Sequence, residues 1–251
     1  CSCRTARSCR SICCDRSPVS ASASRLRVVG SGRAGSSFSG ALESRGWSVD
    51  LVRHTHLDPG AGVDMVLCCV PDAAVPELVA SWPVHPATLV VHCSGSLGLD
   101  VLHPHPRRAS VHPLVSLPDG PKGALRLRGA WFGVAGDPAA LKVVEALEGT
   151  AVEVPDELRG SYHAAAAIAS NHLVALMGQV ERVAAQVGVP LEAYLALAGG
   201  SLANVAELGP PAALTGPVAR GDWSTVRRHL EVIDRSEHPA YLAMAAQAAR
   251  L

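Results

Sequence analysis

The feature that most constrains the fold is a glycine-rich turn in the stretch RLRVVGSGRAGSSFSGALESRG (residues 25–46). The turn follows a short β-branched run, RLRVV. After it, Ala34, Phe38, Ala41 and Leu42 recur at the spacing of one helix face. The pattern G-x-G-x-x-G between a strand and a helix is typical of a turn that binds dinucleotide phosphates. We therefore expect a strand, a phosphate-binding turn and a helix in this stretch.

Strand and helix signals continue to alternate after this turn. Apolar runs predict strands at residues 47–54, 63–70, 87–95, 107–117, 129–136 and 150–155, and helical periodicity predicts helices at 76–82 and 137–149. The run VDMVLCCV is almost continuously apolar, as are strands that are buried on both faces of a sheet. This alternation predicts an α/β fold with a doubly wound, mostly parallel sheet.

The character of the sequence changes near residue 155. A long alanine-rich helical run extends from Glu157 to Val187, and further helices, including TVRRHLEVIDR, follow it without a strand signal. We expect a dinucleotide-binding domain over residues 25–154. An all-helical domain for substrate binding and dimerisation is expected over residues 155–251.

The head of the sequence, residues 1–24, differs from both domains. It holds five of the eight cysteines, is rich in Ser and Arg, and shows no hydrophobic period. We expect it to be a disordered or non-native tail. The remaining cysteines, Cys68, Cys69 and Cys93, stand in apolar strand-like contexts, which is typical of reduced thiols in a cytoplasmic protein.

Composition argues against several functional classes. Acidic and basic residues balance at 22 each and aromatic residues make up 4%, so we expect no nucleic-acid partner. No apolar run reaches the length that a bilayer requires, so we expect no membrane partner. A zinc site built from His92, Cys93, His103 and His105 is an alternative. However, the segment LHPHPRR is irregular and lacks paired metal-ligand spacing, so we expect no metal.

The residues of the glycine turn have distinct expected roles. Gly30 permits the tight turn, Gly32 lets the backbone approach a pyrophosphate, and Gly35 lets the helix pack closely on the strand. The expected cofactor-binding residues here are Gly30, Ser31, Gly32, Arg33, Ala34 and Gly35. A glycine-rich turn without a ligand is the alternative.

The end of the second strand indicates which dinucleotide would bind. NAD enzymes place an acid there for the ribose 2′-hydroxyl, but this strand ends in Arg53, and Asp50 lies inside it. Arg53 and Arg33 suit a 2′-phosphate, because a guanidinium offers it a planar fork of donors. We therefore expect NADP. The alternative is that Arg53 is a solvated surface residue.

The second half of the chain resembles a known family. The segments SYHAAAAIASNHLVAL and ALTGPVARGDWSTVRRHL, together with GSGRAG, VPD, HCSG and VHPL, resemble Rossmann-like oxidoreductases that carry a C-terminal domain of unknown function 2520. The arrangement is similar to that of 6-phosphogluconate dehydrogenase-like, ketopantoate reductase and pyrroline-carboxylate reductase enzymes. The resemblance implies a Rossmann-like fold, NADP-dependent hydride transfer and a small carbonyl or imine substrate. A 2-oxo acid of ketopantoate type is the first class to test.

Two departures from these relatives are visible. Related hydroxyacid dehydrogenases carry a catalytic Lys on the first long helix of the second domain, where this chain offers Arg159, Tyr162 and His163. The missing Lys leaves a second hypothesis, a non-catalytic dinucleotide-binding sensor or partner-binding module. The interval THLDPGAG, between the second and third strands, is also too short for a full crossover helix.

Three loops are expected at the carboxyl edge of the sheet, where open α/β folds bind ligands. They contain Val70, Pro71 and Asp72; Ser94; and His112. The resemblance implies that the first loop touches the cofactor and that the other two approach nicotinamide and substrate. Ser94 is alternatively a turn hydroxyl that bonds to its own backbone, and His112 a packed core histidine.

The helical domain supplies the other candidate catalytic residues. His163 would act as general acid and Asn171 would orient the substrate, on one polar edge of a regular helix. The alternative is that both bond across the domain interface. Thr215 and Arg220 would face the cleft, with Arg220 holding a substrate carboxylate, whereas Asp222 is expected to cap a helix. The apolar, alanine-rich helices predict a homodimer.

Overall fold

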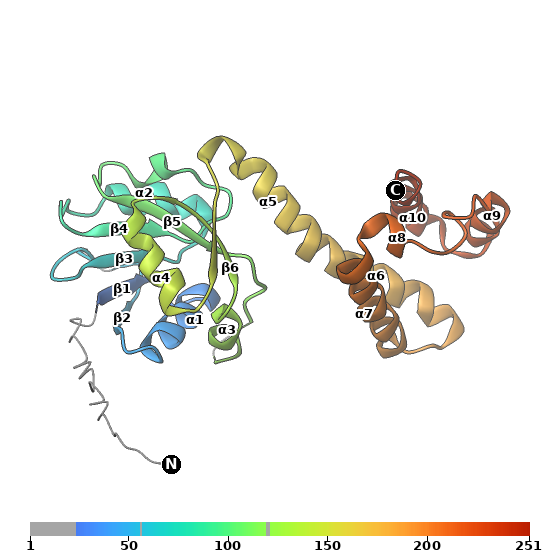
Figure 1. Cartoon of the computed structure of the whole chain (residues 1–251), viewed down its shortest axis with the longest axis horizontal. Coiled ribbons are helices and arrows are strands. Elements are labelled where there is room, and N and C mark those ends of the chain that lie inside the picture. The colour runs from blue at the N-terminus through green and yellow to red at the C-terminus, as the bar shows by residue number, and fades with distance from the viewer. Residues whose placement is uncertain (1–23, 56, 119–120) are drawn as a thin grey trace, which may run out of the picture. The chain divides into compact units, whose positions relative to one another are not determined.

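The computed structural model describes residues 24–55, 57–118 and 121–251. Its contacts divide the chain into two compact units, one that ends at His163 and one from Ala164 to Leu251 (Figure 1). The tail expected over residues 1–24 lies outside the described residues, apart from Ser24. The division falls within the long helical run that the sequence indicated.

The first unit is built on a seven-stranded sheet with the order β2-β1-β3-β4-β5-β6-β7 (Figure 1). Its strands are β1 (Arg25–Val29), β2 (Ser48–Val52), β3 (Met65–Cys68), β4 (Leu89–His92), β5 (Arg108–Pro113), β6 (Trp131–Gly136) and β7 (Thr150–Glu153). Neighbouring strands are parallel except β5 and β6, which are antiparallel. The doubly wound, mostly parallel sheet is confirmed.

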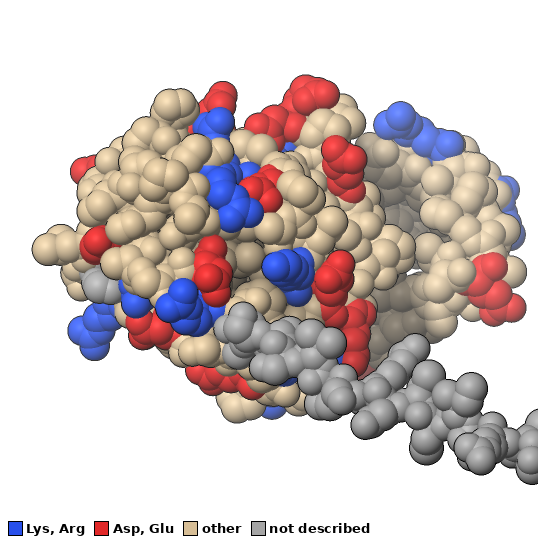
Figure 2. Space-filling view, turned by 60° about the vertical axis from the view of Figure 1, so that its left-hand side comes forward, with Lys and Arg blue, Asp and Glu red and all other residues tan. Residues whose placement is uncertain are grey.

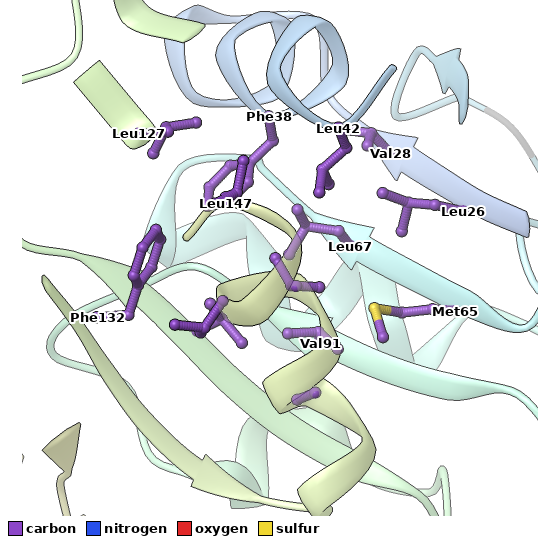
Figure 3. Close-up of a cluster of buried hydrophobic side chains, with 14 of the residues drawn as sticks. Leu26, Val28, Phe38, Leu42, Met65, Leu67, Val91, Leu127, Phe132 and Leu147 are labelled. Atoms are coloured by element: carbon purple, nitrogen blue, oxygen red, sulfur yellow. The ribbon is translucent and has the colours of Figure 1, made fainter. Parts of the chain in front are cut away.

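Helices cover both faces of this sheet. They are α1 (Arg33–Glu43), α2 (Val75–Ala80), α3 (Pro121–Leu127) and α4 (Leu141–Ala146). On one face, Phe38 and Leu42 of α1, Leu127 of α3 and Leu147 after α4 pack on strand residues such as Leu67 (Figure 3). A second buried cluster holds residues of α2 against the strands. The helix face predicted from Ala34 to Leu42 is therefore the face that packs on the sheet.

The link from β2 to β3 has no helix among its described residues, as the short interval predicted. The guanidinium of Arg27 on β1 organises this link. Its Nη1 lies 3.3, 3.0 and 3.2 Å from the carbonyl oxygens of Asp58, Pro59 and Ala61. Its Nε donates to Asp50 at 2.9 Å. A single arginine thus satisfies carbonyls that have no helix to bond them.

The long helical run is present but is not regular. It comprises 3₁₀ turns at Asp156–Leu158 and Ala185–Val187, helix α5 (Arg159–Ala167), a π-helical stretch (Ile168–His172) and helix α6 (Leu173–Ala184). The expectation of one regular helix is wrong, because the π-helical stretch changes the angular step per residue. The spacing of His163 and Asn171 therefore does not show that their side chains share one edge of the helix.

The second unit is helical, as predicted. After α6 come α7 (Leu191–Leu208), α8 (Pro210–Ala213), α9 (Trp223–Val232) and α10 (His238–Ala248). Gln179 and Arg182 of α6 tie this helix to the start of α10. The Gln179 amide donates to the Glu237 carbonyl at 3.0 Å, and Arg182 forms two hydrogen bonds with the Glu237 carboxylate at 2.5 and 3.0 Å.

Two surface properties bear on function. Within the described ranges, no helix of the protein has the length and apolar character needed to cross a membrane. On the face that Figure 2 shows, basic and acidic side chains are interspersed among other residues. The composition of the whole chain is balanced in the same way, because its formal net charge is zero.

Candidate functional site

The glycine turn after β1 has the geometry of a phosphate-binding turn. Gly30 has a φ of +106°, and a Cβ there would stand 2.5 Å from the Cys69 carbonyl oxygen. A Cβ on Gly35 would collide with the Gly30 carbonyl, so this glycine lets α1 start against the turn. Gly32 differs, because a Cβ there would meet nothing within 4 Å. Two glycines are thus required by packing, and the middle one faces open space at the N-terminus of α1.

The end of β2 lies beside this turn. The Gly30 amide donates to the Val52 carbonyl at 2.9 Å, and Arg53 follows directly with an exposed side chain. Arg33, the first residue of α1, is also exposed. Asp50 is engaged by Arg27, which stands opposite it in the β1–β2 register. Arg53 and Arg33 are therefore exposed guanidinium groups near the glycine turn, whereas the Asp50 carboxylate is engaged by Arg27.

The loops after β3 and β4 are joined by hydrogen bonds. The hydroxyls of Ser94 and Ser96 donate to one Asp72 oxygen at 2.6 and 2.8 Å. The Ser94 hydroxyl also accepts from the amides of Ser96 and Leu97, at 3.1 and 3.2 Å. Asp72 and Ser94 therefore shape these loops, which agrees with the turn alternative for Ser94. Val70, before Pro71, lies next to the glycine turn.

The cysteines within the described residues are Cys68, Cys69 and Cys93, and they are free thiols, as the sequence predicted. Cys69 and Cys93 lie at the carboxyl ends of β3 and β4, with their sulfur atoms 3.7 Å apart. Burial raises the pKa of Cys68 to about 12. The Cys68 thiol therefore stays protonated, and Cys69 packs beside the glycine turn.

A polar cluster lies where the first turns of α5 contact β5 and the loop after β4. Arg159, Tyr162 and His163 stand at the i, i+3 and i+4 positions, which share one helix face. His112 of β5 has its Nδ1 atom 2.7 Å from the Tyr162 hydroxyl, and its ring centroid is 6.1 Å from that of His163. Arg159 also reaches β5, where it donates to the Ser110 hydroxyl.

Two glycines make room for this cluster. A Cβ on Gly95, after β4, would stand 2.8 Å from carbon atoms of both the His112 and His163 rings. A Cβ on Gly133, in β6, would collide with the Tyr162 hydroxyl. The Tyr162 side chain therefore lies over a strand position without a side chain, and this allows its hydroxyl to reach His112.

Burial has the largest effect on the pKa values of the cluster, and the buried charge of Arg159 changes them further. The Arg159 side chain is 2% exposed, and its Nε donates to Asp156 at 3.0 Å. Burial, followed by the charges of His163 and Arg159, lowers the pKa of His112 to about 4. Burial raises the pKa of Tyr162, and the Gly133 amide and Arg159 partly oppose this. At neutral pH His112 is therefore uncharged and Tyr162 holds its proton.

The remaining candidates belong to the second unit. Asn171 is exposed in the π-helical stretch and its Oδ1 accepts from Ser170 at 2.8 Å, while Thr215 and Arg220 are exposed in the segment between α8 and α9. Their assignment to the site stays a prediction. The helix-capping role of Asp222 is confirmed, since its carboxylate accepts from the Thr225 amide at 3.1 Å.

Sequence reasoning did not assign Tyr162, Arg159 or Ser110 to the site. The signal that points to them is the spacing of Arg159, Tyr162 and His163 at the start of a helix. Of the residues considered for zinc, His105 has a structural partner: its Nε2 lies 3.2 Å from the Val79 carbonyl oxygen and its ring packs on Trp82. The expected absence of a metal stays a prediction.

Comparisons with known proteins agree with this architecture. Residues 50–118 match the model of a Rossmann-like domain, and residues 130–248 match a domain of unknown function, DUF2520. No curated protein matches the sequence significantly.

Among solved structures, protein TM1727 from Thermotoga maritima is similar at 25% identity and a TM-score of 0.69, over 90% of this chain and 98% of that one. A provisionally named NADP oxidoreductase from Bacteroides fragilis, BF3122, is similar at 16% identity and a TM-score of 0.74, over 91% and 99%. Plasmodium falciparum pyrroline carboxylate reductase, solved with NADP bound, is similar at 11% identity and a TM-score of 0.57, over 90% and 97%. Successive parts of the chain therefore match the models of a Rossmann-like domain and of the domain of unknown function DUF2520.

Proposed function

We propose that the protein is an NADP-dependent oxidoreductase that transfers a hydride between NADP(H) and a small carbonyl or imine compound. The observation that carries this is the glycine turn, where Gly30 and Gly35 are required by packing and Gly32 faces open space. Such a turn at the N-terminus of an eleven-residue helix offers backbone amides to a pyrophosphate. The similar fold of solved NADP-binding reductases supports a dinucleotide-dependent reductase.

The residues around this turn fit NADP better than NAD. Arg53 is exposed directly after β2, beside the turn, and the acid inside the strand is engaged by Arg27. Arg33 adds a second exposed guanidinium at the start of α1. We assign Arg53 and Arg33 to the 2′-phosphate, and Val70, Pro71 and Asp72 to the cofactor side of the site. When bound, the cofactor supplies or accepts the hydride.

The substrate side of the first unit is the cluster of His112, Tyr162 and His163. It lies against Gly95, at the carboxyl end of the sheet where parallel α/β folds bind their ligands. A protonated group in this cluster balances the charge that develops on oxygen or nitrogen as hydride arrives. From the second unit we assign Asn171, Thr215 and Arg220 to substrate binding, on the basis of the resemblance. A 2-oxo acid, with a carboxylate for Arg220, is the first substrate class to test.

Cofactor binding tests the assignment of Arg53. We expect NADPH to bind about ten- to a hundredfold more tightly than NADH, because a charge-assisted phosphate pair contributes about 1.5–3 kcal/mol. Arg53→Ala should abolish most of this preference by weakening NADPH alone. Calorimetric titration of both cofactors measures it, with Arg128→Ala, an exposed arginine after α3, as the matched control. Equal affinities in the wild type would remove the basis for NADP.

Turnover tests the reaction itself. The purified protein is mixed with NADPH and a panel of 2-oxo acids, cyclic imines and aldehydes, and NADPH absorbance is followed. We expect at least one class to be reduced. A wild type that binds NADPH but reduces none of the panel would favour the sensor hypothesis over the reductase.

A further inference from the structure

We infer that Tyr162 is the catalytic proton donor of this site, and that His112 is a positioning residue that orients the phenol and restores its proton. The inference rests on the proposed reductase function. It differs from the expectation that His163 is the general acid, and the observations that favour Tyr162 come from the geometry of the first unit.

The position of Tyr162 is fixed by three elements. Helix α5 carries it, its hydroxyl lies over Gly133 of β6, and His112 of β5 contacts the hydroxyl at 2.7 Å. The two rings meet edge to face, at 5.5 Å between centroids and an interplanar angle of 84°. A proton donor held in this way needs little reorganisation when the substrate arrives.

His163 has a less constrained position. Its side chain is exposed, and within the described part of the chain no hydrogen bond of its ring is found. Its ring packs beside Gly95, after β4, and 6.1 Å from the His112 ring centroid, but these are contacts without a hydrogen bond. His163 therefore borders the site, whereas Tyr162 is anchored within it.

The environment of the Tyr162 oxygen also suits a donor. The buried guanidinium of Arg159, held by Asp156 and Ser110, places a fixed positive charge near the phenol. That charge stabilises the phenolate left behind when the proton departs. A tyrosine remains protonated throughout the range of physiological pH, so its phenol always carries a proton that it can transfer.

The 2.7 Å hydrogen bond permits two proton positions, and the inference requires one of them. If the hydroxyl donates to Nδ1 of His112, its proton is committed to the histidine. If Nδ1–H donates to the phenol oxygen, the phenol proton is free for a substrate. We assign the second arrangement, with the proton of neutral His112 on Nδ1 and Nε2 unprotonated.

With this arrangement, every proton transferred in the reaction has a donor and an acceptor. As hydride adds to the carbon of the C=O or C=N bond, the π electrons pass to oxygen or nitrogen, which takes the Tyr162 proton. The phenolate receives the Nδ1 proton of His112, while Nε2 takes one proton from solvent. The site thus consumes one hydride and one solvent proton, and returns to its starting state once the resulting Nε2 tautomer exchanges with solvent.

Three variants test the assignment with the substrate found in the turnover screen. Tyr162→Phe should lower kcat at least a hundredfold while the Kd for NADPH stays within a few-fold. His163→Ala should lower kcat less than Tyr162→Phe does. The matched control is Tyr241→Phe, which removes a comparable hydrogen bond, at 2.6 Å to His229 Nδ1, within the second unit. Its kcat should stay within a few-fold of the wild type.

Two further measurements test the role of His112. His112→Ala should lower kcat about ten- to a hundredfold, and added imidazole should restore part of the loss, which a purely structural role does not predict. Independently of turnover, ¹⁵N NMR of the His112 ring in the wild type should show a protonated Nδ1 and an unprotonated Nε2.

These experiments can distinguish a failure of the proposed reductase function from a failure of the role assigned to Tyr162. A wild type that neither binds NADPH nor reduces any substrate overturns the proposed function, and this inference with it. If the wild type is active, a Tyr162→Phe variant within tenfold of its kcat, or a larger loss in His163→Ala, overturns the inference alone. An unprotonated Nδ1 on His112 overturns it whether or not a substrate has been found.

Discussion

Arg159 shows how one buried side chain can contribute to the charge state of its neighbours. Its guanidinium is buried on the sheet, donates to Asp156 and Ser110, and leaves Nη1 without a partner within the described residues. A buried positive charge disfavours a second one close by. It therefore helps to keep both His92 and His112 uncharged at neutral pH.

His92 gives a testable consequence for stability. Burial, and then the charge of Arg159, lowers the pKa of His92 to about 4 from a usual 6.5. Between pH 6.5 and 4 the unfolded chain binds a proton at this site and the folded chain does not, so the stability of the fold decreases as the pH is lowered through that window. A shift of this size corresponds to about 3 kcal/mol at most.

Replacing His92 by Leu should therefore reduce the decrease in the free energy of unfolding that occurs at acidic pH. Urea unfolding at pH 7.5 and pH 4.5, followed by tryptophan fluorescence, measures the change. We expect His92→Leu to lose about 2–3 kcal/mol less than the wild type between these pH values. His54→Ala, at an exposed position, serves as the control. An unchanged pH dependence in His92→Leu would show that this histidine titrates normally in the folded protein.

At the scale of elements, the contact between α5 and the sheet depends on Gly133 of β6. A Cβ there would collide with the Tyr162 hydroxyl. We expect Gly133→Ala to displace Tyr162 from His112, to lower kcat at least tenfold, and to cost about 1–3 kcal/mol of stability, because overpacking strains the contact.

The control for this variant lies on α5 itself. A Cβ on Gly160 would meet nothing within 4 Å, so Gly160→Ala should keep kcat within a few-fold and stabilise the helix by up to about 1 kcal/mol. Thermal unfolding and turnover measure both variants. If Gly133→Ala behaved like Gly160→Ala, the close contact of Tyr162 with β6 would not matter for the site.

Much of the first unit could be predicted from the sequence because its elements carry local signals. The strands predicted at 25–29 and 63–70 contain β1 and β3, and the glycine pattern identified the turn between β1 and α1. The sequence contains no local signal for the antiparallel direction of β6, because an apolar run does not depend on the direction of the strand that it forms. Helix α3 was also missed, since seven residues that include a glycine give a weak helical period.

The candidate site was predictable only in part, for a related reason. Gly30, Gly32 and Gly35 lie in one short stretch, so their spacing indicated their roles. Tyr162 and His112 stand fifty residues apart in the sequence, and no local pattern indicates their hydrogen bond. Their contact depends on where α5 crosses β5 and on the missing side chain at Gly133.

At the scale of the whole molecule, the second unit exposes much apolar surface. Neither α7 nor α10 has a buried residue, although both are apolar helices. On α7, Leu197, Leu202 and Leu208 are 67, 54 and 55% exposed. A pocket of about 690 Å³ opens between α6, α7, α9 and α10, with a lining that includes Val187 and Val232. A helix that is apolar on all sides is usually buried, so this surface requires a cover.

We propose that a second copy of the chain supplies the cover, as a homodimer through the helical unit. A stable interface of this kind buries on the order of 1,200–2,000 Å² in total, and the exposed leucines of α7 can contribute to such a surface. Light scattering after gel filtration should give twice the mass of the chain. Leu197→Lys combined with Leu202→Lys should shift the protein toward monomer, because each buried lysine would lose its hydration without gaining a partner. Leu125→Lys, at a 65% exposed position on α3, should leave the mass unchanged. A wild type that is monomeric at micromolar concentration would contradict the dimer and leave the apolar surface of α7 to a different partner.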